Sequence, residues 1–341
     1  MEDNKQYTND NKPVETDSRE EFFHEKPPVL KKRINWIKLA LVLIVIGLLV
    51  YGISWAAGAR SGFITFENGW FRVVTSGNSE THNINISTGQ TINEININAG
   101  WSNVIIEPAA RNADLGVTLS NISQNSVSYT RDTLTINAAE YSRNIQIMSF
   151  GFNFPRYEIR VQIPAGQDID INITTSSGTV RVNDINPENL NIRTTSGGIR
   201  INDINTNSLD LRSTSGSIRS QNLNFSDGNV QSSSGSINLT NASWGNLSAR
   251  STSGSIRLRS VLVNDINSGE TTVQSSSGSS TIELRNRNSS DFNYTLRAST
   301  GSVRADGMRG NNNFIEATNI AGNHTIRVNA SSGSIRLSFN N

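Results

Sequence analysis

The chain of 341 residues contains no cysteine. A disulfide framework, a thiolate metal site and a cysteine nucleophile are therefore all excluded. Histidine is scarce as well, because only His24, His82 and His324 occur and they lie far apart in the chain. The net charge of +1 gives no general attraction for nucleic acid, so we expect no nucleic-acid partner.

Lysine is confined to one end of the sequence. All six lysines lie at or before Lys38, and all 22 basic residues after it are arginine. The sequence therefore divides near residue 35 into two parts of different composition. The second part is dominated by Asn, Ser and Thr.

An apolar segment follows the last lysines. Leu39 to Ala59 are 21 residues without a charge, which as a helix would cross a hydrocarbon core of about 30 Å. We predict a transmembrane signal-anchor helix over residues 34–59, which would make the lipid bilayer one partner of the chain. Lys31, Lys32 and Arg33 precede it, so the positive-inside rule places residues 1–33 in the cytoplasm and the remainder outside.

The composition of residues 1–33 is polar and proline-containing, which is typical of a disordered tail. A cleaved signal peptide is the alternative to an anchor, because Ala57-Gly58-Ala59 resembles a cleavage site. The apolar run is longer than the core of a usual signal peptide, so we favour the uncleaved anchor.

Residues 60–170 alternate between apolar and polar side chains, which predicts strands. No fixed period is visible there, so we interpret this part as an irregular β lead-in section or cap. Phe150, Phe152 and Phe154 cluster within it around Gly151. They are a candidate aromatic contact for a glycan, a lipid surface or a partner; the alternative is that they fold onto the cap.

From residue 171 to residue 341 one phrase recurs, as in LNIRTTSGGIRI and LDLRSTSGSIRS. Its glycine recurs every 19 residues from Gly178 to Gly254 and then at Gly278, Gly301 and Gly333. Apolar residues stand five before, two after and four after the glycine, which predicts a strand, a turn and a second strand with one face buried. The sequence therefore predicts an all-β fold, a parallel β-solenoid with coils of about 19 residues.

Identical offsets should stack in columns about 4.8 Å apart. We expect the glycine to adopt positive φ at the corner, and the Ser/Thr column just before it to be a structural hydrogen-bonding stack. Two arginine columns, three after and four before the glycine, are a candidate polyanion-binding site because guanidinium groups grip phosphate. The candidates are Arg181, Arg200, Arg219, Arg257, Arg193, Arg212 and Arg250, with Arg304, Arg336 and Arg297 at the same offsets. The alternative is a solvated face partly neutralised by nearby carboxylates.

No motif for catalysis is present. The sequence offers no Ser-His-Asp arrangement, no metal-ligand spacing and no phosphate-binding loop, so we expect no enzyme, no metal and no cofactor. A site assembled across coils stays open as an alternative, and its mark would be two carboxylates about 5–10 Å apart in one groove.

The SGS-I-R-L phrases and the preceding V-x-I-P-A-G at Val161–Gly166 resemble the bacterial "putative adhesin" β-strand-repeat family, a domain of unknown function. The resemblance covers about residues 90–341. With a single N-terminal anchor, the layout is similar to a LiaG-like, membrane-anchored member. The resemblance implies a non-enzymatic role at the cell surface and carries no catalytic residues over.

Together these features predict a single-pass, membrane-anchored β-solenoid that acts as a binding or scaffold module at the bacterial envelope, in adhesion or envelope stress. Its expected partners are an anionic cell-wall polymer or an envelope protein. One alternative is a polysaccharide-acting β-helix enzyme. Another is an accessory protein of an envelope-stress signalling system.

Overall fold

The computed structural model describes most of the chain beyond residue 79 and parts of what precedes it. The described residues are 42, 44–49, 52, 61–67, 70–75, 80–86, 92–139, 145–151, 156–260, 269–285, 288–319 and 323–340. For 61–67, 70–75, 145–151 and residue 340 only the backbone is described.

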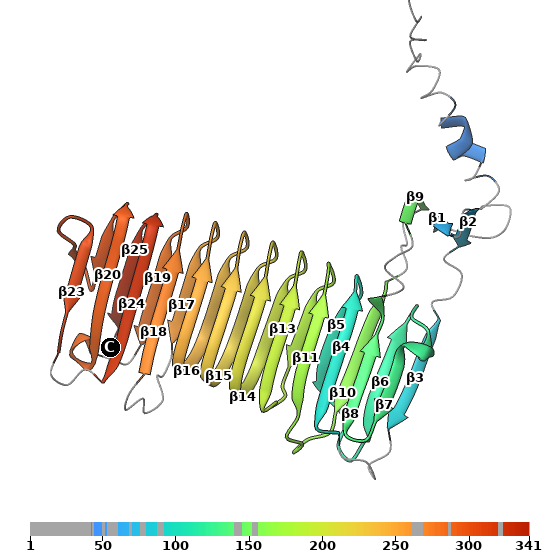
Figure 1. Ribbon diagram of the computed structural model, residues 1–341, viewed down its shortest axis with the longest axis horizontal. Helices are drawn as coiled ribbons and strands as arrows, with labels where there is room; N and C mark the ends of the chain where they lie inside the picture. The colour runs from blue at the N-terminus through green and yellow to red at the C-terminus, as the bar shows by residue number, and fades with distance from the viewer. Residues whose placement is uncertain are drawn as a thin grey trace, which may run out of the picture. The chain divides into compact units, whose positions relative to one another are not determined.

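The repeating unit is a coil of two strands joined by the Ser-Gly turn (Figure 1). β11 (Asp170–Thr175) precedes the turn at Gly178, and β12 (Val180–Asn183) follows it. The next coil repeats the pattern 19 residues later, so Ile173 of β11 pairs with Ile192 and Val180 pairs with Ile199. All these pairings are parallel and in register, which confirms the predicted all-β solenoid over the Ser-Gly repeats.

The coils form two facing layers, which we call the pre-turn sheet and the post-turn sheet. In the described residues the pre-turn sheet runs in the order β7 (Val127–Thr130), β8 (Thr133–Asn137), β4 (Glu94–Gly100), β11, β13 (Asn189–Thr194), β14 (Ile199–Ser213), β15 (Ile218–Ser232), β16 (Ile237–Ser251), β18 (Gly269–Ser275), β24 (His324–Ser332), β20 (Phe292–Thr300) and β23 (Phe314–Ala317).

The post-turn sheet runs in the order β3 (Thr81–Ile86), β6 (Leu115–Ser120), β10 (Glu158–Ile163), β5 (Asn103–Pro108), β12, β14, β15, β16, β17 (Ile256–Ser260), β19 (Ser280–Arg285), β25 (Ile335–Asn340), β21 (Val303–Ala305) and β22 (Met308–Arg309). β14, β15 and β16 belong to both sheets because each continues around the far corner of the coil. Two short 3₁₀ helices, η1 (Gln124–Ser126) and η3 (Ser289–Asp291), lie in connections.

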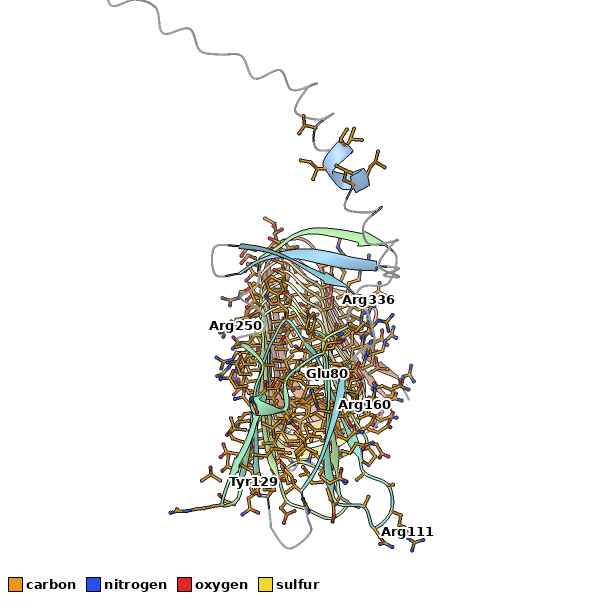
Figure 2. All side chains as sticks on the ribbon, turned by 90° about the vertical axis from the view of Figure 1, so that its right-hand side faces the viewer. Glu80, Arg111, Tyr129, Arg160, Arg250 and Arg336 are labelled. Carbon is orange, nitrogen blue, oxygen red and sulfur yellow. The ribbon has the colours of Figure 1, made fainter. Side chains whose placement is uncertain are left out.

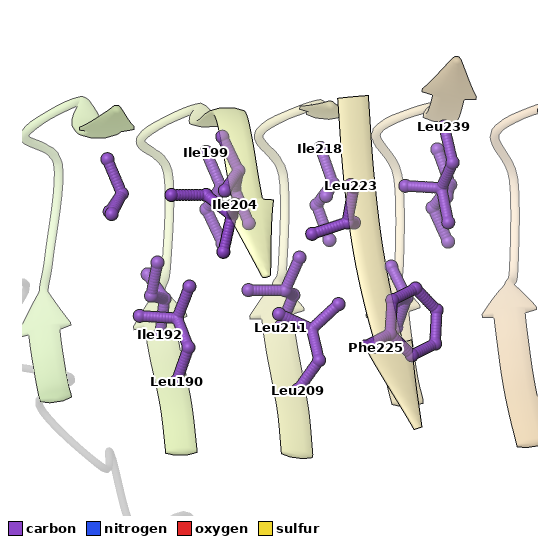
Figure 3. Packing of buried hydrophobic residues seen from close by; sticks show 14 of the residues in the cluster. Leu190, Ile192, Ile199, Ile204, Leu209, Leu211, Ile218, Leu223, Phe225 and Leu239 are labelled. Carbon is purple, nitrogen blue, oxygen red and sulfur yellow. The ribbon is translucent and has the colours of Figure 1, made fainter. Parts of the chain in front are cut away.

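The core lies between the two sheets and repeats with the coil. Ile192, Leu211 and Val230 stack at one level, and Ile199 and Ile218 stack at another, all of them fully buried (Figure 3). Because side chains alternate across a strand, each phrase sends its apolar residues inward and its polar residues outward. Burying each such side chain contributes about 1.5–3 kcal/mol.

The glycine of the turn is required by the neighbouring coil. A Cβ on Gly197 would lie 1.9 Å from the carbonyl oxygen of Gly178, and one on Gly216 would lie 1.8 Å from that of Gly197. The expected positive φ is wrong for the glycines from Gly178 to Gly278, since only Gly301 and Gly333 adopt it, at 121° and 134°. The turn needs glycine for close approach of two backbones, not for a left-handed conformation.

The hydroxyl that holds the turn is three residues before the glycine, not one. Thr194 and Ser213 are buried there, and their Oγ atoms accept hydrogen bonds from the N–H groups of Gly197 and Gly216 at 2.9 and 2.8 Å. The serines directly before the glycine, such as Ser215, are exposed. The predicted hydrogen-bonding column therefore exists, but two positions upstream of the serines that we expected to form it.

The corner opposite the turn is built by Asn and Asp. Asp184, Asp203, Asn222 and Asn241 recur every 19 residues and adopt φ between 51° and 56°. These residues tolerate the left-handed region better than other non-glycine residues. Their side chains also join successive coils, because the amide of Asn222 donates to Asp203 and that of Asn241 donates to Asn222.

The last coils do not stack in chain order. β24 and β25 lie between the coil of β18 and β19 and the coil of β20 and β21. The glycines accordingly stack in the order Gly278, Gly333, Gly301. The spacer between the last two phrases supplies antiparallel strands beyond the outermost coil, with β23 on β20 and β22 on β21. The 32-residue spacing between Gly301 and Gly333 thus supplies strands that cover the edges of the outermost coil.

At the other end, β4 and β5 form a further coil on β11 and β12, with Ser102 where the later coils have glycine. Beyond it, β3, β6 and β7 pair antiparallel and end the two sheets. A separate sheet contains β2 (Trp70–Thr75), β1 (Ser61–Glu67) and β9 (Ile145–Gly151). The boundary at residue 170 between the lead-in section and the repeats stays a prediction.

The predicted transmembrane segment lies mostly outside the described residues. Val42, residues 44–49 and Gly52 are helical. Among the described residues, no helix is long and apolar enough to cross a membrane. Residues 1–33, which we predict to be a disordered tail, lie wholly outside them.

We expect Gly216→Ala to destabilise the solenoid by at least about 2 kcal/mol, because its Cβ would overlap a backbone carbonyl that cannot move independently. Gly198→Ala is the matched control, since its nearest neighbour would be 3.5 Å away. Urea unfolding followed by circular dichroism compares the two midpoints. Equal midpoints would show that the close approach at the turn is not limiting.

Candidate binding surfaces

The two arginine columns lie on different sheets. The pre-turn arginine column (Arg193, Arg212, Arg250 and Arg297) is on the outer face of the pre-turn sheet. The post-turn arginine column is on the outer face of the post-turn sheet, and Figure 2 shows Arg250 and Arg336 on opposite sides of the coils. The structure therefore does not gather the seven predicted candidates into one site; it separates them into two.

The post-turn arginine column is not neutralised. Register pairing places Arg181 beside Arg200 and Arg200 beside Arg219 on successive coils. No ion pair links any member to a carboxylate of the described residues. The column comprises Arg181, Arg200, Arg219, Arg257, Arg336 and Arg304 in spatial order, with Asn238 and Thr281 filling the two remaining rungs.

The pre-turn arginine column is largely occupied by local partners. Arg193 and Arg212 both bind the carboxylate of Asp210, at 3.1 and 3.0 Å. Arg250 donates to the side-chain carbonyl of Gln274 at 2.8 Å, and Arg297 lies over the ring of Phe314 at 5.3 Å. These contacts reduce the charge that the column presents, as the alternative of a partly neutralised face predicts.

A shallow groove follows the pre-turn arginine column beside the turns. One cavity of about 390 Å³ extends from Thr174 to Arg250, and another of about 280 Å³ continues from Arg250 to Arg297. Hydroxyl, amide and guanidinium groups line both cavities. This lining can donate many hydrogen bonds, but it brings no carboxylate into the groove.

The carboxylates that approach one another are already engaged. Asp210, Asp227 and Glu270 line an open depression of about 530 Å³ on the pre-turn sheet, farther from the turns than the arginine column. Asp227 accepts from Asn246 at 2.9 Å, and Arg327 binds Glu270. The hydrogen bond from Arg327 lowers the pKa of Glu270, the opposite of what a general acid needs. In the part of the chain described here, no group of three or more His, Asp or Glu side chains could hold a metal ion.

The predicted aromatic contact is only partly visible. Phe150 belongs to β9, where its backbone pairs with Gly62, while Phe152 and Phe154 lie outside the described residues. Two aromatic side chains that we did not single out are exposed instead, namely Trp101 at 55 % and Tyr129 at 53 %. Trp101 stands at the tip of the turn between β4 and β5. The exposed position of Trp101 could not be predicted from the sequence because its turn lacks the Ser-Gly phrase.

A polar cluster is buried in the core near the distal coils. Nε2 of His324 lies 2.8 Å from Oγ1 of Thr271, which also accepts from Nε1 of Trp244 at 2.8 Å. The hydroxyl of Thr271 can donate to Nε2 or accept a second hydrogen bond from it, according to the histidine tautomer, while Nδ1 is buried without a hydrogen-bond partner among the described residues. Burial lowers the pKa of His324 to about 4, and the charge of Glu270 opposes this shift.

Residues 92–338 match the model of the family described as Toastrack DUF4097. No curated protein matches the sequence. Among solved structures, a "putative lipid binding protein" from Parabacteroides distasonis is 17% identical over 77% of this chain and 98% of its own, with a TM-score of 0.45. A "putative adhesin" from Bacteroides fragilis is 13% identical over 76% and 97%, with a TM-score of 0.44. A "putative cell adhesion protein" from Clostridium sporogenes is 14% identical over 77% and 100%, with a TM-score of 0.30.

We expect the protein to lose stability when the pH falls below 6.5. An unfolded His324 takes up a proton near pH 6.5, whereas the folded one does so only near pH 4. Stability from this group is thus complete above pH 6.5 and falls by about 2 kcal/mol between pH 6.5 and 5. His324→Gln should remove that loss, which urea unfolding at pH 7 and pH 5 measures. A variant with the same loss as the wild type would contradict the assignment.

Proposed function

The chain belongs to the Toastrack DUF4097 family, and we propose that it is a non-enzymatic binding module of the bacterial envelope. In this proposal residues 34–59 hold it in the membrane, and the post-turn arginine column binds phosphate-rich anionic material of the envelope. The observation that carries the proposal is the unneutralised stack of arginines on the post-turn sheet.

The chemistry of this column suits a repeating phosphate. Guanidinium groups form two parallel hydrogen bonds with phosphate oxygens, and the parallel strands repeat them about every 4.8 Å. A polymer or surface with many phosphates can therefore meet several arginines at once, and each contact that forms raises the chance of the next. Five of the six side chains are exposed, so binding would not require the solenoid to open.

A catalytic role has less support. The candidate carboxylates Asp210, Asp227 and Glu270 are each held by arginine or amide side chains. Glycoside hydrolysis needs one carboxyl group that stays protonated near neutral pH, and the lowered pKa of Glu270 does not provide it. Adhesion, the LiaG-like subtype and a role in envelope stress are finer assignments within this proposal.

We expect replacement of Arg200, Arg219 and Arg257 by Ser to weaken binding to polyphosphate or purified anionic wall polymer by at least tenfold at low salt. Each lost phosphate contact also removes nearly one released counterion. The slope of log affinity against log salt should therefore become shallower by about 2. Isothermal titration of the full chain in neutral detergent across a salt series gives both quantities.

The control replaces Arg111, Arg131 and Arg285 by Ser. It changes the net charge by the same amount, and these three exposed arginines lie outside both columns. Binding should be nearly unchanged. If both triple variants weaken binding equally, the attraction is general and the column is not a site. No binding by the wild type at low salt would reject the polyanion proposal altogether.

We expect the protein to sediment with membranes and to resist extraction at alkaline pH, because the apolar run from Leu39 to Ala59 is long enough to span a bilayer. External protease on intact cells should digest the solenoid and spare an epitope in residues 1–33. Ile44→Arg together with Leu48→Arg should release the protein or block its export. Recovery of the wild type in the soluble fraction would exclude the anchor.

A further inference from the structure

We propose that the edge of the solenoid formed by the Ser-Gly turns docks on the anionic lipid surface of the membrane in which the chain is anchored. This edge, the turn edge, runs in each of the eight phrases from four residues before the glycine to three after it. The proposal rests on the proposed function and names lipid phosphate as its anionic partner.

The charges of the solenoid are segregated between its two edges. Across the eight phrases the turn edge contains ten arginines and no Asp or Glu. The opposite corner carries exposed carboxylates on several coils, at Asp168, Asp184, Glu188, Asp203 and Asp227. The net charge of +1 therefore does not show that positive and negative side chains are separated between the two edges. An anionic surface attracts the turn edge and repels the opposite corner.

The arrangement of the two arginine columns suits a flat anionic surface better than a single linear polymer. The columns lie on opposite faces of a two-layer structure, as Arg250 and Arg336 show in Figure 2. The turns, with exposed hydroxyls such as those of Ser215 and Ser253, join the two layers along the edge between the columns. A single linear polymer can follow only one column, because the body of the coil separates them. A flat phosphate surface pressed against the turns can meet both columns, since each arginine lies only four residues before or three residues after a turn glycine and has a long flexible stem.

Trp101 supplies a second, independent observation. Its turn lies in line with the Ser-Gly turns, because the N–H of Ser176 donates to the carbonyl of Gly100 at 2.6 Å. The tryptophan therefore projects from the turn edge itself and is 55 % exposed. An exposed indole is costly in water but favoured at the headgroup level of a bilayer, where its ring is apolar and its N–H stays hydrated.

The chain path also ties the turn edge to the predicted anchor. In the coil of β8 and β10, the chain leaves the turn edge at Ala138, whose N–H donates to the carbonyl of Asn98, and returns at Tyr157, whose carbonyl accepts from the N–H of Asn103. Between these points lies β9, in place of a short turn. β9 pairs with β1, which starts at Ser61, two residues after the apolar run ends. In this proposal, the sheet of β9 and β1 connects the turn edge to the predicted anchor.

The test uses the full chain in lipid nanodiscs and exploits its lack of cysteine. One fluorophore is attached through Ser253→Cys at the turn edge, and in a second sample through Ser226→Cys at the opposite corner, where the serine is also exposed. The discs contain either phosphatidylcholine alone or phosphatidylcholine with phosphatidylglycerol. A nitroxide on a fraction of the headgroups quenches any label that lies close to the surface.

We expect quenching of the label at residue 253 only in the discs with phosphatidylglycerol, and reversal of it by high salt. The label at residue 226 should stay unquenched in both. Replacing Arg200, Arg219 and Arg257 by Gln should weaken the docked state on the order of a hundredfold. Trp101→Ala should weaken it to a smaller extent and without changing its salt dependence.

The proposal is overturned if both labels are quenched equally, or if neither responds to phosphatidylglycerol. Polyphosphate binding is measured on the same protein in the phosphatidylcholine discs. If polyphosphate binds while the label at residue 253 stays unquenched, the proposed function stands and the docking proposal fails. If polyphosphate does not bind and no label responds, both fail.

Discussion

The structure depends on the contact between the backbones of successive turns. Each turn glycine from Gly197 onwards lies against the carbonyl of the glycine stacked before it, at a distance that excludes a side chain. This close approach aligns one coil with the next, and the alignment fixes the register of both sheets. The apolar columns between the sheets and the arginine columns outside them both follow from that single alignment.

Much of the fold could be predicted because the repeat shows each position several times, so that equivalent residues can be compared across phrases. An offset that is apolar in at least seven of the eight phrases points inward, so Ile199 and Leu211 could be placed in the core from the sequence. The stacking order of the last coils could not be predicted. Gly301 and Gly333 belong to equivalent phrases, and nothing local in either phrase says which one contacts Gly278. That choice depends on long-range pairing.

The candidate site shows a different limit. The arginine offsets could be read from the sequence, but not their partners, because Asp210 lies in a later coil than Arg193 and reaches it only through stacking. Nor could net charge show how the charges are distributed. The near balance of acidic and basic residues suggests a neutral face, yet the fold places ten arginines at one edge and several carboxylates at the opposite corner.

The displaced coil of β24 and β25 limits how such a protein can change in length. A regular solenoid grows by adding a coil at its end, because the new coil needs only one neighbour. Here the outermost coil, β20 and β21, pairs on its outer side with the covering strands β23 and β22. On its inner side it pairs with β24 and β25, which come later in the chain. Duplication of a phrase is compatible with this arrangement only among the coils between Gly178 and Gly278, where chain order and stacking order agree. Length can therefore vary in the middle of this solenoid while its end stays constant.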